Sequence, residues 1–157
     1  MIAVLMGVSG SGKTTIGERV AARLGWRFID ADDHHPPANV AKMSAGIPLE
    51  DEDRWPWLDK LNGLLRAEGD AVLACSALKE AYRQRLLAGV GERRLFFLAG
   101  DKALIASRLA ARKHRYMPAS LLDSQFATLE APAQAIRVDV SAPVERSVDV
   151  IVQALAR

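Results

Sequence analysis

The stretch Gly7-Val8-Ser9-Gly10-Ser11-Gly12-Lys13-Thr14 decides the fold of this chain. It satisfies the pattern G-x-x-x-x-G-K-S/T, and it follows an apolar run from Ile2 to Met6. After it, Ile16, Val20 and Leu24 recur at the spacing of a helix. In such a loop the glycines let backbone N–H groups approach a phosphate, the lysine reaches the outer phosphate oxygens, and the threonine can bind Mg²⁺. An ordinary glycine-rich turn is the alternative, but the strand before the loop and the helix after it favour nucleotide binding.

Outside this loop, short apolar runs alternate with helical patterns. The runs that predict strands are Ile2–Met6, Trp26–Asp30, Ala71–Cys75, Leu95–Ala99 and Ile136–Val140. Helical patterns follow the loop up to Leu24, then run from Pro37 to Ala45, along the stripe from Trp57 to Leu65, over Ala77–Leu87, from the predicted cap Asp101 to Leu109, and over Leu121–Leu129 and Val144–Leu155. Continuous apolar strands are typical of parallel sheets that helices cover on both faces. We therefore expect an α/β protein with the P-loop NTPase fold, built as one domain (residues 1–157) around a five-stranded parallel sheet.

The composition limits the classes of partner. The chain has 157 residues, of which 50% are hydrophobic and 25% charged, with 21 basic against 19 acidic side chains. A net charge of +2 makes no case for nucleic-acid binding, and no apolar run approaches the ~20 residues of a membrane span. The single cysteine, Cys75, cannot form an internal disulfide, which fits a reducing compartment. We expect a cytoplasmic protein without nucleic-acid or membrane partners.

Two carboxylates come at the end of the second predicted strand. Asp30 and Asp32 lie where open α/β sheets place their ligands, at the carboxyl edge of the strands. Two residues apart on an extended chain, they would project the same way and form a shared site for Mg²⁺ and a hydroxyl group. The alternative is a capping or solvated acidic loop.

Three basic residues are candidates for binding an acidic substrate. Arg54 precedes Trp55-Pro56-Trp57, and these rigid neighbours could hold its planar fork against a carboxylate; a surface ion pair with a neighbouring acid is the alternative. Lys79 and Arg83 follow the third predicted strand and would share a helix face at i and i+4. Their alternative is a solvated helix end.

A basic stretch begins at Arg108 and includes Arg112, Lys113 and Arg115. Phosphoryl transfer depends on positioning and on cationic charge around the transferred group, which a basic lid over residues 112–120 would supply. We expect Arg112 to contact phosphate or adenine, with Arg108 as a second nucleotide contact. The alternative for both is a solvated charge.

The chain resembles the gluconate kinase family of small P-loop kinases, which are related in fold to shikimate and adenylate kinases. The motifs that carry the resemblance are M-G-V-S-G-S-G-K at 6–13, D-x-D-x-x-H-P at 30–36, N-x-x-K-M-x-x-G-x-P-L at 39–49, D-x-D-R-x-P-W-L at 51–58, C-S-A-L-K at 75–79 with Tyr82 and Arg83, and S-Q-F-x-x-L-E-x-P at 124–132. The family often has R-K-x-H-F in the lid, whereas this chain has Arg115 where the histidine would align and His114 one position earlier.

The resemblance implies ATP-dependent phosphorylation of D-gluconate at its 6-hydroxyl, giving 6-phosphogluconate and ADP, with Mg²⁺, in a homodimer. By analogy, Asp32 would orient the hydroxyl and accept its proton, Asp30 would hold a Mg²⁺-bound water, and the turn Val140–Pro143 would lie beside adenine. His35 aligns with a family histidine that would contact substrate hydroxyls, with a local structural hydrogen bond as its alternative.

The expected site residues fall into four groups. They are Lys13, Asp32 and Arg112 for catalysis; Gly7, Val8, Ser9, Gly10, Ser11, Gly12, Lys13, Thr14, Thr15, Arg108 and Arg112 for the nucleotide; Asp32, His35, Arg54, Lys79 and Arg83 for the substrate; and Thr14 and Asp30 for Mg²⁺.

Two other functions compete with this interpretation. Shikimate kinase is the nearest enzyme, but its glycine triplet after the third strand is replaced here by Ser76-Ala77-Leu78-Lys79. A nucleotide-dependent binding or switch protein is the other, although the sequence has no N-K-x-D guanine-reading motif and no D-x-x-G after the third strand.

Overall fold

The structure is a computed structural model that describes residues 1–111 and 119–156. It contains one parallel sheet with the strand order β2-β3-β1-β4-β5. The strands are β1 (Ile2–Met6), β2 (Arg27–Asp30), β3 (Ala71–Ala74), β4 (Arg93–Ala99) and β5 (Ile136–Asp139). The helices are α1 (Lys13–Leu24), the short 3₁₀ helix η1 (Ala31–His34), α2 (Pro37–Ser44), α3 (Asp51–Ala67), α4 (Glu80–Leu87), α5 (Lys102–Ala110), α6 (Ala119–Thr128) and α7 (Val144–Leu155). The predicted five-stranded parallel α/β fold is confirmed.

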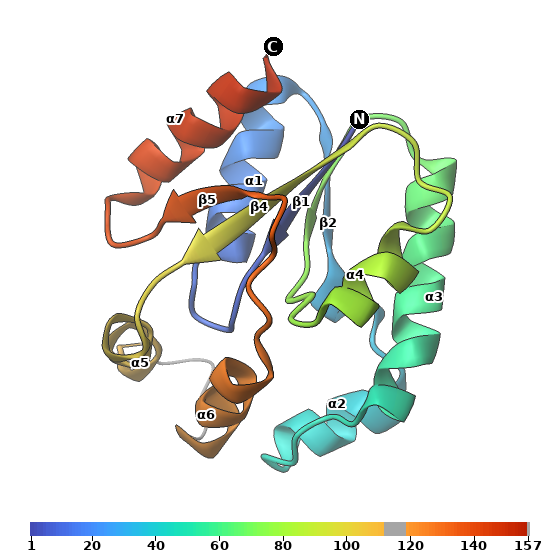
Figure 1. Cartoon of the computed structure of the whole chain (residues 1–157), viewed down its shortest axis with the longest axis vertical. Coiled ribbons are helices and arrows are strands. Elements are labelled where there is room, and N and C mark those ends of the chain that lie inside the picture. Colours follow the sequence, from blue (N-terminus) through green and yellow to red (C-terminus); the bar gives the residue numbers. More distant parts are fainter. Residues whose placement is uncertain (112–118, 157) are drawn as a thin grey trace.

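Helices cover both faces of the sheet. Figure 1 shows α1 and α7 together on one side and α3 with α4 on the other, while α2, α5 and α6 lie near the carboxyl ends of the strands. Each layer buries an apolar stripe, such as Ile16 and Val20 of α1 and Leu58, Leu61 and Leu65 of α3. This two-sided cover is why the central strands read as continuous apolar runs.

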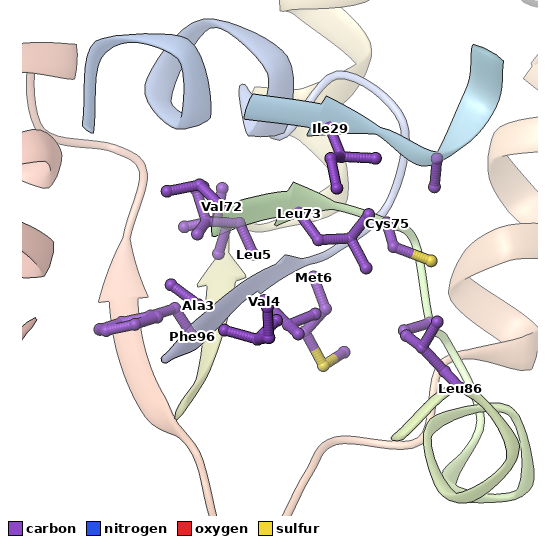
Figure 2. Packing of buried hydrophobic residues seen from close by; sticks show 14 of the residues in the cluster. Ala3, Val4, Leu5, Met6, Ile29, Val72, Leu73, Cys75, Leu86 and Phe96 are labelled. Atoms are coloured by element: carbon purple, nitrogen blue, oxygen red, sulfur yellow. The ribbon is translucent and has the colours of Figure 1, made fainter. Parts of the chain in front are cut away.

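The core is centred on β1 and β3, in which every residue is buried. Figure 2 shows Val4 and Leu5 of β1 close to Leu73 of β3 and Phe96 of β4. The Cys75 thiol lies in this core at 1% exposure, as predicted, and burial raises its pKa to about 12. The thiol therefore stays protonated and acts as a small apolar group.

The topology identifies the carboxyl ends of the strands, close to β1, as the ligand-binding side of the sheet. From β1 the chain passes through α1 to β2 at one edge, whereas from β4 it passes toward β5 at the other edge. Ligands of open α/β sheets bind at the carboxyl ends of the strands where such connections diverge. The loop that follows β1 starts from this divergence point.

Two predicted details of local structure are wrong. The helix expected over 77–87 begins only at Glu80, because Ala77 has a φ of +45° and Lys79 is extended at the helix N-cap. Asp30 and Asp32 do not lie on one extended segment, because β2 ends at Asp30 and η1 turns the chain at once. The predicted cap of α5 is confirmed, since the Asp101 carboxylate accepts a hydrogen bond from the Leu104 N–H at 2.8 Å.

In the described ranges, no helix combines the length and the apolar character that crossing a membrane requires.

Candidate active site

The glycine-rich loop packs tightly against the sheet. A Cβ atom on Gly7 would lie 2.9 Å from the carbonyl oxygen of Leu98 in β4, so only glycine fits there. Gly12 has a φ of +96° and is the N-cap of α1 without a side-chain cap, and the first turn of α1 contains no acidic residue. The positive end of the helix dipole and its N–H groups are therefore available to an anion.

Two residues at the start of α1 link the loop to its surroundings. The Lys13 ammonium donates to the carbonyl oxygens of Gly7 and Val8, both at 3.0 Å, which folds this cation back over the loop. The Thr14 hydroxyl donates to Oδ2 of Asp30 at 3.0 Å. Asp30 uses its other oxygen, Oδ1, to accept the N–H of Asp32 at 3.0 Å. The threonine and the first predicted carboxylate thus form a compact pair of oxygen donors.

The loop separates two cavities, which share Gly10 and Gly12 as lining residues. The smaller cavity has a volume of about 420 Å³ and contains Thr15, Arg108 and the turn 141–143 on its walls. The larger cavity has a volume of about 640 Å³ and is lined by Lys13, Thr14, Asp32, His35, Arg54 and Gln125, among others. A phosphate chain lying along the loop would therefore reach from one cavity into the other.

The smaller cavity contains the predicted second nucleotide contact. Arg108 lies in its wall, and Nη2 of this side chain donates a hydrogen bond to the carbonyl oxygen of Val140. The arginine thereby joins α5 to the turn after β5, the turn expected beside adenine. Arg112 and most of the predicted lid, residues 112–118, lie outside the described residues.

The larger cavity brings Asp32 and His35 together. The Asp32 side chain is 58% exposed, whereas that of His35 is only 3% exposed, and their Oδ1 and Nε2 atoms are 3.7 Å apart. The imidazole stacks on Trp57 with ring centroids 4.1 Å apart, and the indole N–H of Trp57 donates to the carbonyl oxygen of Ala31 at 2.7 Å. Trp57 itself is buried, so α3 supplies a rigid wall that fixes the histidine ring.

Arg54 points toward the same cavity but is held differently from the prediction. Its Nη1 atom donates to the carbonyl oxygen of Leu49 at 2.8 Å and to the hydroxyl of Tyr82 at 3.0 Å. Within the described part of the chain, its Nη2 and Nε atoms have no hydrogen-bond partner, and the side chain is 16% exposed. The guanidinium therefore retains donors for a ligand, and Tyr82 rather than the flanking tryptophans fixes its position.

Tyr82 connects Arg54 to an acidic residue at the start of α3. Its hydroxyl donates to the carboxylate of Asp51, and the ammonium of Lys79 lies 3.5 Å from the same carboxylate. The Tyr82 hydroxyl, together with Lys79 and Arg54, holds the pKa of Asp51 below its usual range, while burial raises the pKa of Tyr82. Lys79 thus neutralises Asp51 and does not line the larger cavity.

Arg83 does not occupy the place expected for a substrate contact. It is buried at 3% exposure, and its guanidinium donates to the carbonyl oxygens of Ala77 at 2.8 Å, Leu78 at 3.2 Å and Glu130 at 2.9 Å. These carbonyl groups lie before α4 and after α6, so Arg83 ties both segments together. It shares no exposed face with Lys79, and it does not line the larger cavity.

Two site residues were missed by the sequence analysis. Gln125 of α6 accepts the N–H of Ser9 on Oε1 at 2.7 Å and donates from Nε2 to the Ser9 hydroxyl at 3.0 Å. Asn39 of α2 is buried and bonds to both His35 and the Asp53 carbonyl oxygen. Both belong to the motifs quoted above, yet only the folded chain shows what they touch, because their partners are 4 to 116 residues away.

Comparison with known proteins identifies the family of this chain. The AAA domain family matches residues 2–134. A probable gluconokinase of Xenopus tropicalis is 45% identical over 97% of this chain and 90% of its own length. A gluconokinase of Gluconobacter oxydans is 46% identical over 98% of this chain and 88% of its own length. The crystal structure of a gluconokinase from Sinorhizobium meliloti superimposes with a TM-score of 0.92 at 43% identity, covering 99% of this chain and 91% of that one. The chain belongs to the gluconokinase family of P-loop kinases.

Proposed function

We propose that this protein transfers the γ-phosphoryl group of ATP to the 6-hydroxyl of D-gluconate. The observation that carries the proposal is the position of the glycine-rich loop between two cavities, one with Arg108 and the other with Asp32, His35 and Arg54. A nucleotide in the smaller cavity would direct its outer phosphate toward an acidic polyol in the larger one. The gluconokinases among the relatives support ATP and gluconate as the two substrates.

The nucleotide half acts through backbone groups and one cation. The N–H groups at the start of α1 bind the phosphates, and Lys13 leaves the loop carbonyls to pair with the β- and γ-phosphate oxygens. Thr14 and Asp30 offer oxygen donors only, which is what Mg²⁺ prefers, and we propose that Thr14 binds the ion directly and Asp30 through water. When bound, the ion supplies positive charge to the phosphate oxygens.

The substrate half orients the attacking group. Asp32 accepts the proton of the 6-hydroxyl as that oxygen bonds to the γ-phosphorus and the bond from phosphorus to the ADP oxygen breaks. Arg54 pairs its remaining donors with the carboxylate at the far end of gluconate. Fixing both ends of the substrate places the reacting hydroxyl in line with the leaving group.

Steady-state ADP release with a panel of acceptors tests this function. We expect release to depend on ATP, Mg²⁺ and gluconate, with shikimate and glucitol much poorer, and mass spectrometry to identify a 6-phosphorylated acid. Lys13→Ala is the negative control. It should remain folded, because the Lys13 ammonium faces loop carbonyls rather than the core, but its ADP release should be suppressed. A folded wild-type protein that binds ATP but releases no ADP with gluconate would exclude the function, and faster release with shikimate would favour the alternative kinase.

Cytoplasmic location and a homodimeric state remain predictions. Size-exclusion chromatography with light scattering tests the second of them.

A further inference from the structure

We propose that Asn39 is a positioning residue that fixes the proton of His35 on Nε2, which makes this imidazole a hydrogen-bond donor beside Asp32. The inference about the tautomer stands on the unliganded geometry, whereas its use on a substrate hydroxyl rests on the proposed function. Neither Asn39 nor the tautomer of His35 has a role in the mechanism described so far.

The argument starts at the backbone of α3. The carbonyl oxygen of Asp53 can only accept hydrogen bonds, and Nδ2 of Asn39 lies 2.8 Å from it. Turning the amide around would bring its oxygen against this carbonyl oxygen, placing two acceptors in contact at a buried site. The Asp53 carbonyl therefore decides which end of the Asn39 amide is the nitrogen.

The same amide nitrogen then decides the state of the imidazole. Nδ2 of Asn39 is 3.2 Å from Nδ1 of His35, and it has a second hydrogen to donate in that direction. Nδ1 must accept this hydrogen, so in the neutral ring the proton is on Nε2. Rotating the ring by 180° would replace the accepting nitrogen by a carbon, and the stack on Trp57 holds the ring plane.

The protonated nitrogen faces the exposed carboxylate of the larger cavity. Nε2 of His35 is 3.7 Å from Oδ1 of Asp32, which is too long for a hydrogen bond between them. A hydroxyl oxygen about 2.8 Å from both atoms, an ordinary hydrogen-bond length, fits this separation. Such a hydroxyl would accept from His35 and donate to Asp32, so that its proton points at the base and a lone pair points away from it.

This arrangement divides the work between two adjacent groups. His35 cannot accept the substrate proton while Nε2 already carries one, so Asp32 remains the acceptor. Asn39 touches no substrate and acts only through the histidine, which separates its effect from that of a binding residue.

The test is the tautomer of His35 in the unliganded protein, measured with ¹⁵N-histidine labelling and long-range ¹H–¹⁵N correlation of the neutral ring. The other two histidines, His34 and His114, are assigned with single glutamine variants. We expect a protonated Nε2 and an unprotonated Nδ1 in the wild type. In Asn39→Asp a carboxylate oxygen can face Nδ1 and accept, so the proton moves to Nδ1. If that variant does not fold, Asn39→Ala, which lacks the donor, should shift both resonances toward an average of the two tautomers.

Asn62→Asp is the matched control. The Asn62 amide also donates to two carbonyl oxygens, those of Leu86 and Ala88, but on the far part of α3. It should leave the His35 resonances unchanged and kcat within about twofold, as expected for a distant independent site. Asn39→Asp should lower kcat by about 10- to 100-fold, the range that follows loss of the hydrogen-bond partner of a metal-binding imidazole, with the KM for ATP little changed.

The outcomes separate the two proposals. A proton on Nδ1 in the wild type, or an unchanged tautomer in both Asn39 variants, overturns the positioning role. If the wild-type protein instead shows the expected tautomer and its shift in the variants but no turnover of gluconate, the positioning role holds and the proposed function fails.

Discussion

The two halves of the site are built in different ways. The phosphate-binding part of the nucleotide half comes from one continuous segment, 7–15, whose backbone conformation is set by tight packing at Gly7 and a left-handed Gly12, while Arg108 and the turn 141–143 complete the smaller cavity. The substrate half comes from η1, α2, α3 and α6, and its side chains are held by other side chains, as in the pairs Tyr82–Arg54 and Asn39–His35.

This difference has a consequence for mutation. In the nucleotide half, most binding groups are N–H groups that no side-chain replacement removes. In the substrate half, deleting one side chain releases its neighbour, so effects there should be strongly non-additive. Separate measurements of ATP binding, turnover and acid recognition test whether the two halves respond differently to mutation.

The largest effect is expected for Asp32→Asn. The amide keeps the shape of the side chain but cannot accept a proton as a carboxylate does, so kcat should fall by about 10²- to 10⁴-fold. ATP affinity, measured by calorimetry, should change little, because the nucleotide half is backbone-built. Glu18→Gln removes a carboxylate charge from an exposed position on α1 that lines neither cavity, and it should stay within about threefold of wild type because solvent screens exposed charges. Loss of ATP binding in Asp32→Asn would show that the halves are not separable.

Arg54→Ala should have the next largest effect. A charge-assisted hydrogen bond contributes about 1.5–3 kcal/mol, so kcat/KM for gluconate should fall by about 10- to 150-fold. The preference for gluconate over glucitol should narrow, because glucitol has no carboxylate that Arg54 could bind. Arg54→Lys should recover part of the loss, since an ammonium cannot present a fork. An equal fall for gluconate and glucitol would remove Arg54 as the carboxylate-binding residue.

The same difference explains what the sequence could predict. The loop, the strands and the cap Asp101 were predictable because each depends on residues within one short window, and the structure confirms the sheet and the cap. Helix α4 was predicted three residues too early, because the left-handed Ala77 breaks the helix and its carbonyl oxygen binds Arg83. The same guanidinium binds the carbonyl oxygen of Glu130, 47 residues away. No local pattern contains that contact.

For the substrate half, candidate residues were named from the sequence, but the contacts between them were not predicted. Arg54 was named, yet its partner Tyr82 is 28 residues away, and no contact between the two was predicted. Lys79 and Arg83 were paired by helical spacing, but one neutralises Asp51 and the other is buried on carbonyl groups. Helical spacing predicts which face of a helix a basic residue occupies, but it does not predict which neighbouring group that residue binds.

Gln125 tests whether the two halves act independently, because this one side chain contacts both of them. It holds Ser9 of the loop by two hydrogen bonds from α6. Gln125→Ala should lower kcat by about fivefold, the value of roughly one neutral hydrogen bond, while ADP affinity stays near normal. Gln84→Ala, an exposed glutamine on α4, is the control and should change neither. A large loss of ADP affinity in Gln125→Ala would mean that the nucleotide half depends on α6.

The smallest expected effect concerns Asp51, which tests whether the side chains of the substrate half stabilise one another. The Tyr82 hydroxyl, then Lys79 and Arg54, hold the pKa of Asp51 below its usual value of 3.8. A carboxyl group whose pKa is depressed by folding stabilises the protein fully above its unfolded pKa and loses that contribution as pH falls through the folded pKa.

Tyr82→Phe removes the main cause of the shift, so the pH dependence has a definite sign. The variant should be less stable than wild type at pH 6 by under about 1 kcal/mol, because the carboxylate is 41% exposed and solvent screens it. That difference should shrink as pH falls below about 3.8, where the carboxylate of the unfolded wild type is protonated. Urea unfolding at pH 6 and pH 3 measures both values. Phe retains the ring that Arg54 and Lys79 face, so lost packing does not mimic the effect. A difference that is the same at both pH values would show that the hydroxyl stabilises the fold without acting through Asp51.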